Sequence, residues 1–152
     1  MIQIIHGDLL QCNATYICHQ VNCMGVMGAG VAKQIKSLYP KVFFNYQNLC
    51  KQYENRPAQL LGSAQMIALS EISSTPCVVN LFGQVGYGRD SVQTNLPALQ
   101  KACQKVADYA DPEEIIAMPY RIGCGLAGGN WGDVMDMLTE VFKDKTLHLY
   151  KL

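Results

Sequence analysis

Short apolar runs alternate with amphipathic stretches along the chain. The apolar runs predict strands at residues 2–6, 16–21, 64–69, 77–82, 115–118 and 146–150. Apolar residues that recur at helical spacing predict helices at residues 31–38, 41–53, 96–107 and 131–142. Strands that alternate with helices in this way are typical of an α/β fold. No repeat, linker or low-complexity segment interrupts the pattern, so residues 1–152 are expected to form a single domain.

Two glycine-rich stretches, residues 22–31 and 123–129, each lie between a predicted strand and a predicted helix. In an open α/β sheet, ligands bind beyond the carboxyl ends of the strands, where such loops gather. Successive backbone N–H groups in a glycine-rich loop, together with the N-terminus of the next helix, form an anion site without lysine or arginine. The loops therefore predict a phosphate-binding site, although glycines that merely turn the chain would leave the same pattern.

The charge balance agrees with a site built from the backbone. Twelve basic residues balance twelve acidic ones, so no long-range attraction to nucleic acid or to an anionic membrane is expected. The first loop lacks the lysine and hydroxyl of a P-loop, and its glycines do not follow the dinucleotide pattern G-x-G-x-x-G. A P-loop nucleotidase and a dinucleotide-dependent dehydrogenase are therefore not indicated.

Seven cysteines occur at irregular spacing and without a C-x-x-C pair. This pattern indicates neither a disulfide framework nor a zinc site, and thiols in this number suit a reducing cytosol. The first ten residues lack the features of a signal peptide, and no apolar run reaches the length of a membrane span. We expect a soluble cytoplasmic protein that uses no metal or cofactor and no membrane partner.

A set of motifs, in chain order, resembles the macrodomain family. The motifs are Gly7-Asp8-Leu9, Asn22, Gly28-Ala29-Gly30-Val31-Ala32, Pro119, Ile122-Gly-Cys-Gly-Leu126 and Trp131. Because they span nearly the whole chain, they are more specific than either loop alone. The branch that the chain resembles contains terminal ADP-ribose protein glycohydrolase, DNA ADP-ribosyl glycohydrolase antitoxins and ADP-ribose 1''-phosphate phosphatases. The resemblance implies a three-layer α/β/α fold with a mixed central sheet.

The resemblance also implies a site for ADP-ribose or ADP-ribose 1''-phosphate, with ADP-ribosylated protein or nucleic acid as further partners. It implies that Asp8 accepts a hydrogen bond from the adenine amino group beside the Leu9 backbone, although a capping aspartate would fit the same position. Asn22 is implied to contact the distal ribose. The residues implied to line the diphosphate are Gly28, Ala29, Gly30 and Val31 on one side and Gly123, Cys124, Gly125, Leu126 and Ala127 on the other.

The chain departs from this branch at two catalytic positions. The glycohydrolases have a lysine after the fourth core strand, where this chain has Gly83 or Gln84. They also have an aspartate just after the leucine of the second loop, where this chain has Ala127. Neither glycine nor glutamine can form a covalent adduct with the sugar, so lysine-dependent glycohydrolysis is not expected.

The segment from Gly83 to Asp90, together with His19, instead resembles the ADP-ribose 1''-phosphate phosphatases. Removing a phosphate requires a positioned water, proton transfer and neutralisation of phosphoryl charge. Asp90 and His19 are the candidates for proton transfer, with Asn22 beside them as a third catalytic candidate. Arg89 is a candidate for holding the phosphate, and Tyr87 for closing over the distal ribose. Four of them have structural alternatives: a helix cap for Asp90, a surface cation for Arg89, a buried structural histidine for His19 and packing against the loop for Tyr87.

Three functions therefore remain open at this point. The leading one is a hydrolase that removes phosphate from ADP-ribose 1''-phosphate. The second is a non-catalytic reader of free or protein-linked ADP-ribose, which needs the two loops and Asp8 but not Asp90. The third is an ADP-ribosyl glycohydrolase in which Asp90, His19 or an ordered water replaces the lysine.

Overall fold

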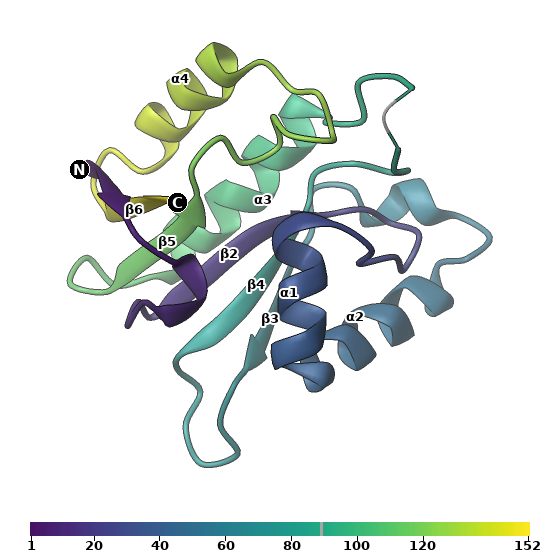
Figure 1. Cartoon of the computed structure of the whole chain (residues 1–152), viewed down its shortest axis with the longest axis horizontal. Helices are drawn as coiled ribbons and strands as arrows, with labels where there is room; N and C mark the ends of the chain where they lie inside the picture. Colours follow the sequence, from purple (N-terminus) through teal and green to yellow (C-terminus); the bar gives the residue numbers. More distant parts are fainter. Residues whose placement is uncertain (89) are drawn as a thin grey trace.

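The computed structural model describes residues 1–88 and 90–152 of the chain. Its strands are β1 (Ile2–His6), β2 (Tyr16–Val21), β3 (Ala64–Ala68), β4 (Cys77–Phe82), β5 (Ile115–Pro119) and β6 (Thr146–Lys151). Its α-helices are α1 (Gly30–Leu38), α2 (Pro40–Gln52), α3 (Leu96–Tyr109) and α4 (Trp131–Val141) (Figure 1). Every predicted strand and helix is confirmed, with ends that differ by no more than two residues.

The strands form one mixed sheet in the order β1-β6-β5-β2-β4-β3. Adjacent strands from β1 to β4 in this order pair in parallel, whereas the edge strand β3 is antiparallel to β4. The carboxyl ends of the parallel strands therefore all lie on the same side of the sheet. β2 lies between β4 and β5, so the chain segments that leave these three strands meet at one place.

The two faces of the sheet are covered by different helix pairs. The hydrophobic core on one face is formed with α3 and α4, and the core on the other face with α1 and α2 (Figure 1). Side chains along β2 point alternately to the two faces of the sheet. Tyr16 and Cys18 therefore pack on the first face, and Ile17 and Val21 on the second. The predicted three-layer α/β/α architecture with a mixed sheet is confirmed. No helix in the described part of the chain is long and apolar enough to cross a membrane.

Candidate functional site

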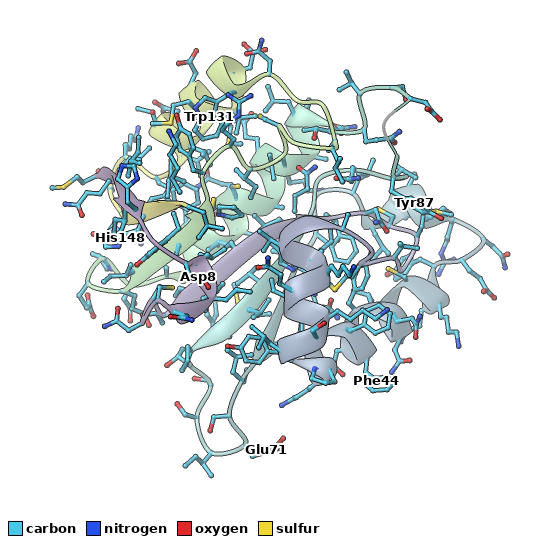
Figure 2. All side chains as sticks on the ribbon, viewed as in Figure 1. Asp8, Phe44, Glu71, Tyr87, Trp131 and His148 are labelled. Carbon is cyan, nitrogen blue, oxygen red and sulfur yellow. The ribbon has the colours of Figure 1, made fainter. Side chains whose placement is uncertain are left out.

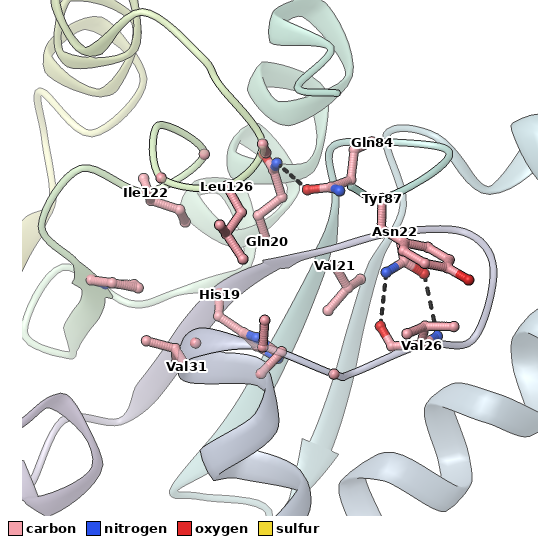
Figure 3. Close-up of a pocket in the computed structure, with 18 of the residues that line it drawn as sticks. His19, Gln20, Val21, Asn22, Val26, Val31, Gln84, Tyr87, Ile122 and Leu126 are labelled. Carbon is pink, nitrogen blue, oxygen red and sulfur yellow. Dashed lines mark hydrogen bonds between the residues drawn. The ribbon is translucent and has the colours of Figure 1, made fainter. Parts of the chain in front are cut away.

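A cavity of about 570 Å³ lies where β2, β4 and β5 end, within the usual size range of small-molecule sites. Three segments surround it, one after each of these strands: the first glycine loop (residues 22–31), the segment 84–88 and the second glycine loop (residues 123–129) (Figure 3). Of the predicted site residues, those that line the cavity are His19, Asn22, Gly28, Ala29, Gly30, Val31, Tyr87, Gly123, Gly125, Leu126 and Ala127. The sheet order thus brings the two loops together in space. Val31 and Gly123, which line the same cavity, are 92 positions apart in the sequence.

Asn22 organises the start of the first loop. Its Oδ1 accepts hydrogen bonds from the backbone N–H groups of Met24 (2.9 Å) and Val26 (3.3 Å), and its Nδ2 donates to the Val26 carbonyl (2.7 Å) (Figure 3). The buried hydroxyl of Tyr46, from α2, lies 2.7 Å from Oδ1 and 2.8 Å from the carbonyl oxygen of Asn22. These hydrogen bonds fix the backbone conformation of the loop before Gly28.

The first loop ends at the N-terminus of α1, which opens on the cavity. Ala29, Gly30, Val31 and Ala32 all line the cavity there. Within the described chain, no side chain caps this end of α1 and no acidic residue lies in its first turn, whereas asparagine side chains cap α3 and α4. The first backbone N–H groups of α1 and its helix dipole are therefore available to an anion in the cavity.

The second loop is closed by its own backbone and held by its neighbours. The Gly129 N–H donates to the Gly123 carbonyl at 2.9 Å, and the same carbonyl accepts from the Thr94 hydroxyl at 2.6 Å. Gly123 has a φ of 75°, in the left-handed region that favours glycine. A Cβ atom at Gly129 would lie only 2.6 Å from the Gly123 carbonyl oxygen, so this close backbone approach requires glycine.

Gln20 links the second loop to the segment after β4. Its Nε2 donates to the Gln84 Oε1 at 2.7 Å and to the Thr94 Oγ1 at 2.9 Å, and Gln84 in turn donates to the Gly86 carbonyl at 2.7 Å (Figure 3). Gln84, which with Gly83 is a candidate for the position of the glycohydrolase lysine, is therefore a neutral side chain held by hydrogen bonds on both sides. Gln20 Oε1 is buried and has no hydrogen-bond partner among residues 1–88 and 90–152.

His19 lies at the inner end of the cavity and is only 1% exposed. Burial lowers the pKa of its imidazole to about 4, against the opposing effect of a 2.6 Å hydrogen bond between Nε2 and the Asn80 Oδ1. The ring is therefore neutral at pH 7. Its Nδ1 is buried and has no partner in the described part of the chain.

The geometry agrees with what the comparisons with known proteins show. The macro domain family matches residues 18–138, a range that contains both glycine loops and every described residue that lines the cavity. The chain belongs to the macrodomain family. The macrodomain of Mycobacterium tuberculosis DarG has the same fold, with a TM-score of 0.81 and 25% identity over 100% of this chain and 98% of that one.

Two curated relatives carry different names. The DNA ADP-ribosyl glycohydrolase of Mycobacterium tuberculosis is 27% identical to this macrodomain over 94% of the chain, which spans only 39% of that relative's length. The ADP-ribose 1''-phosphate phosphatase of Debaryomyces hansenii is 24% identical, and the alignment covers 99% of this chain and 98% of that one. The family is thus established, whereas the relatives' names differ in the reaction that they describe.

Other predicted residues of this macrodomain do not line the cavity. Asp8 is exposed and caps a 3₁₀ turn (Leu9–Gln11) by accepting a hydrogen bond from the Leu10 N–H at 2.9 Å. Leu9 is buried in the core beside α1 and α2, and Cys124 in the core beside α3 and α4. Asp90 is exposed next to the segment 84–88. Arg89 lies outside the described residues. The functional roles assigned to these residues stay predictions.

The sequence analysis missed two polar residues of the macrodomain cavity. Arg121 lines it, and its φ of 65° is unusual for a residue other than glycine. A signal was present, since Arg121 lies inside the Pro119–Leu126 motif. Gln20 also lines the cavity, and its place beside His19 in an apolar strand was a second signal. In the described part of the chain, no group of three or more His, Cys, Asp or Glu side chains could hold a metal ion.

Proposed function

We propose that the cavity binds ADP-ribose and its 1''-phosphate, with the diphosphate between the two glycine loops. The observation that carries this proposal is the uncapped N-terminus of α1, which opens on the cavity opposite the second loop. Phosphate oxygens are the groups that backbone N–H donors at a helix N-terminus bind well. Arg121 is the one lysine or arginine among the described lining residues, so the backbone supplies most of the donors.

The sheet order supports an elongated ligand. Asp8 follows β1, at one edge of the sheet, whereas Tyr87 follows β4 near the other edge. Figure 2 shows the two side chains well apart. A ligand with its adenine near Asp8 and its terminal ribose near Tyr87 would carry its diphosphate past both loops. ADP-ribose has this order of groups, and Leu126 and Val31 offer the ligand apolar contacts between its ends.

We further propose that the protein removes the phosphate from ADP-ribose 1''-phosphate. Water attacks the phosphorus atom, the bond to the C1'' oxygen breaks, and the products are ADP-ribose and inorganic phosphate. Asp90 is the candidate that accepts a proton from the water and returns it to the C1'' oxygen, and His19, whose free Nδ1 lone pair can accept a hydrogen bond from a ribose hydroxyl, is the second catalytic candidate. The relative named as a phosphatase, which matches over nearly its full length, supports this choice. Gln84, fixed between Gln20 and Gly86, cannot replace the glycohydrolase lysine.

A second candidate function is a non-catalytic reader of ADP-ribose. One observation favours it: no carboxylate is among the described residues that line the cavity, and Asp90 is exposed beside it. A reader needs only the loops and the cavity. Free ADP-ribose, an ADP-ribosylated protein and an ADP-ribosylated nucleic acid would then be its partners.

Incubation with ADP-ribose 1''-phosphate, followed by measurement of released phosphate, distinguishes these functions. The phosphatase proposal predicts turnover that falls at least tenfold in His19→Gln and in Asp90→Asn. The matched control is Asp136→Asn, an exposed position on α4, which should keep full turnover. Tight ADP-ribose binding without phosphate release would contradict the phosphatase and support the reader. Release of ADP-ribose from ADP-ribosylated DNA or protein would instead support a glycohydrolase without the lysine.

A further inference from the structure

A row of polar side chains crosses three strands on the face of the sheet covered by α1 and α2. His19 in β2 lies in register with Asn80 in β4, and Asn80 lies in register with Gln65 in β3. His19 is 1% exposed and Asn80 is fully buried. The rest of this face is largely apolar core, where a polar group destabilises the fold unless it is hydrogen-bonded.

The donor and acceptor of each hydrogen bond in this row can be assigned, starting from a backbone carbonyl of α2. The Asn45 carbonyl can only accept, so the Gln65 atom 3.1 Å from it is the donor Nε2. Gln65 Oε1 therefore faces Asn80, where it accepts from Nδ2 at 3.0 Å. Asn80 Oδ1 is left to face His19 Nε2 at 2.6 Å. Because Oδ1 can only accept, Nε2 carries the proton.

This direction decides which kind of group His19 presents to the cavity. A neutral imidazole with its proton on Nε2 has a lone pair on Nδ1 and accepts hydrogen bonds there. Nδ1 is buried without a partner in the described part of the chain, and His19 lines the cavity. Figure 3 shows the His19 ring on the side of β2 where Val31 lies, in the first turn of α1.

We propose that Asn80 and Gln65 are positioning residues that hold His19 in the Nε2–H tautomer, so that Nδ1 accepts a hydrogen bond from a hydroxyl of the ligand's terminal ribose. The inference rests on the proposed binding of ADP-ribose. The terminal ribose is assigned from the strand order. β2, which carries His19, lies next to β4, the strand that precedes Tyr87. It is separated by β5 and β6 from β1, the strand that precedes Asp8. A phosphate oxygen cannot hydrogen-bond to Nδ1, because both atoms are hydrogen-bond acceptors.

The site therefore has one region that donates hydrogen bonds to the ligand and another that accepts them. The N–H groups of the α1 N-terminus face the acceptor groups of the ligand, which are its phosphates. His19 Nδ1 faces a donor group, and Gln20 Oε1 is a second buried acceptor without a partner among the described residues. A ligand that carries phosphates at one part and free hydroxyls at another matches both requirements.

Nitrogen NMR of the histidine side chains tests the tautomer in the free protein. At pH 7, the His19 ring of the wild-type protein should be neutral, with Nε2 protonated and Nδ1 unprotonated. Gln65→Met removes the link to the Asn45 carbonyl and should give a mixture of tautomers, whereas Gln100→Met, on the exposed face of α3, should leave the ring unchanged. Asn80→Asp places a carboxylate beside Nε2 and should charge the ring.

Ligand addition tests the selection of a hydroxyl. ADP-ribose should shift the Nδ1 resonance of the wild-type protein, whereas ADP, which lacks the terminal ribose, should not. The ratio of the ADP dissociation constant to that of ADP-ribose should fall about tenfold in His19→Phe and in Asn80→Asp, and about threefold in Gln65→Met, the milder substitution. Gln100→Met should keep the wild-type ratio.

The outcomes separate this inference from the proposed function. A protonated Nδ1 or a charged ring in the free wild-type protein would overturn the inference even if ADP-ribose binds. An Nδ1 resonance that ADP-ribose leaves in place, or that ADP shifts equally, would also overturn it. Failure of wild-type protein to bind ADP-ribose would overturn the proposed function, while the tautomer of the free protein would still report on the roles of Asn80 and Gln65.

Discussion

Replacement of Gly129 by alanine is expected to weaken ADP-ribose binding about a hundredfold and to lower the melting temperature by about 5 °C. The added Cβ would lie 2.6 Å from the Gly123 carbonyl oxygen and 3.3 Å from the Thr94 Cβ. Because the first contact is with the backbone, the second loop itself has to move. Its N–H groups would then no longer converge on the diphosphate, and the loss of one such preorganised donor in an enzyme site costs about a hundredfold to a thousandfold in rate.

The control for this substitution is Gly125→Ala in the same loop. A Cβ at Gly125 would have no atom within 4 Å, so the melting temperature should change by about a degree or less. Calorimetric titration with ADP-ribose and thermal unfolding of both variants measure the two effects. Wild-type affinity in a folded Gly129→Ala protein would show that the second loop does not bind the diphosphate.

Acidification is expected to remove about 3 kcal/mol of folding free energy through His19 alone between pH 6.5 and pH 4. Above pH 6.5 the ring is neutral in both the folded and the unfolded protein, and this contribution is fully present. As the pH falls below 6.5, the unfolded chain binds a proton at His19, whereas burial keeps the folded pKa at about 4. The unfolded state then carries more protons, so the free energy of unfolding decreases by about 1.4 kcal/mol per pH unit.

Urea unfolding of the wild-type protein and of His19→Gln at several pH values between 7 and 4 tests this expectation. The variant should show a shallower loss of stability, so the difference in unfolding free energy between the two proteins should change with pH by about 3 kcal/mol. His6→Gln, at an exposed position, is the matched control and should follow the wild-type curve. Parallel curves for wild type and His19→Gln would mean that the folded protein accommodates a charged His19.

The elements of the fold could be predicted from the sequence because apolar periodicity reports directly on which residues face the core. The strand order could not be read in this way, since β2 lies between β4 and β5 although they are distant in the chain. The two glycine loops were nevertheless expected to meet, because each follows a strand and parallel strands end at one edge. The structure confirms that Val31 and Gly123 line the same cavity.

The polar part of the site was harder to predict because it depends on hydrogen bonds between distant segments. Asn22 is predicted to contact the distal ribose, and nothing in the sequence indicates that its Oδ1 accepts hydrogen bonds from Met24, Val26 and Tyr46. Gly83 or Gln84 is predicted to stand at the position of the glycohydrolase lysine, and the sequence does not reveal that Gln84 accepts a hydrogen bond from Gln20. Sequence periodicity identifies buried positions but not the partners that satisfy a buried polar atom.

Calorimetric titration of the wild-type protein with ADP-ribose tests the central claim most directly, because that claim is a diphosphate site between the two glycine loops. The account predicts one ADP-ribose per chain, with a dissociation constant of about 10 μM or lower. The absence of saturable binding at about 1 mM ADP-ribose, in a sample whose folding has been verified, would contradict it.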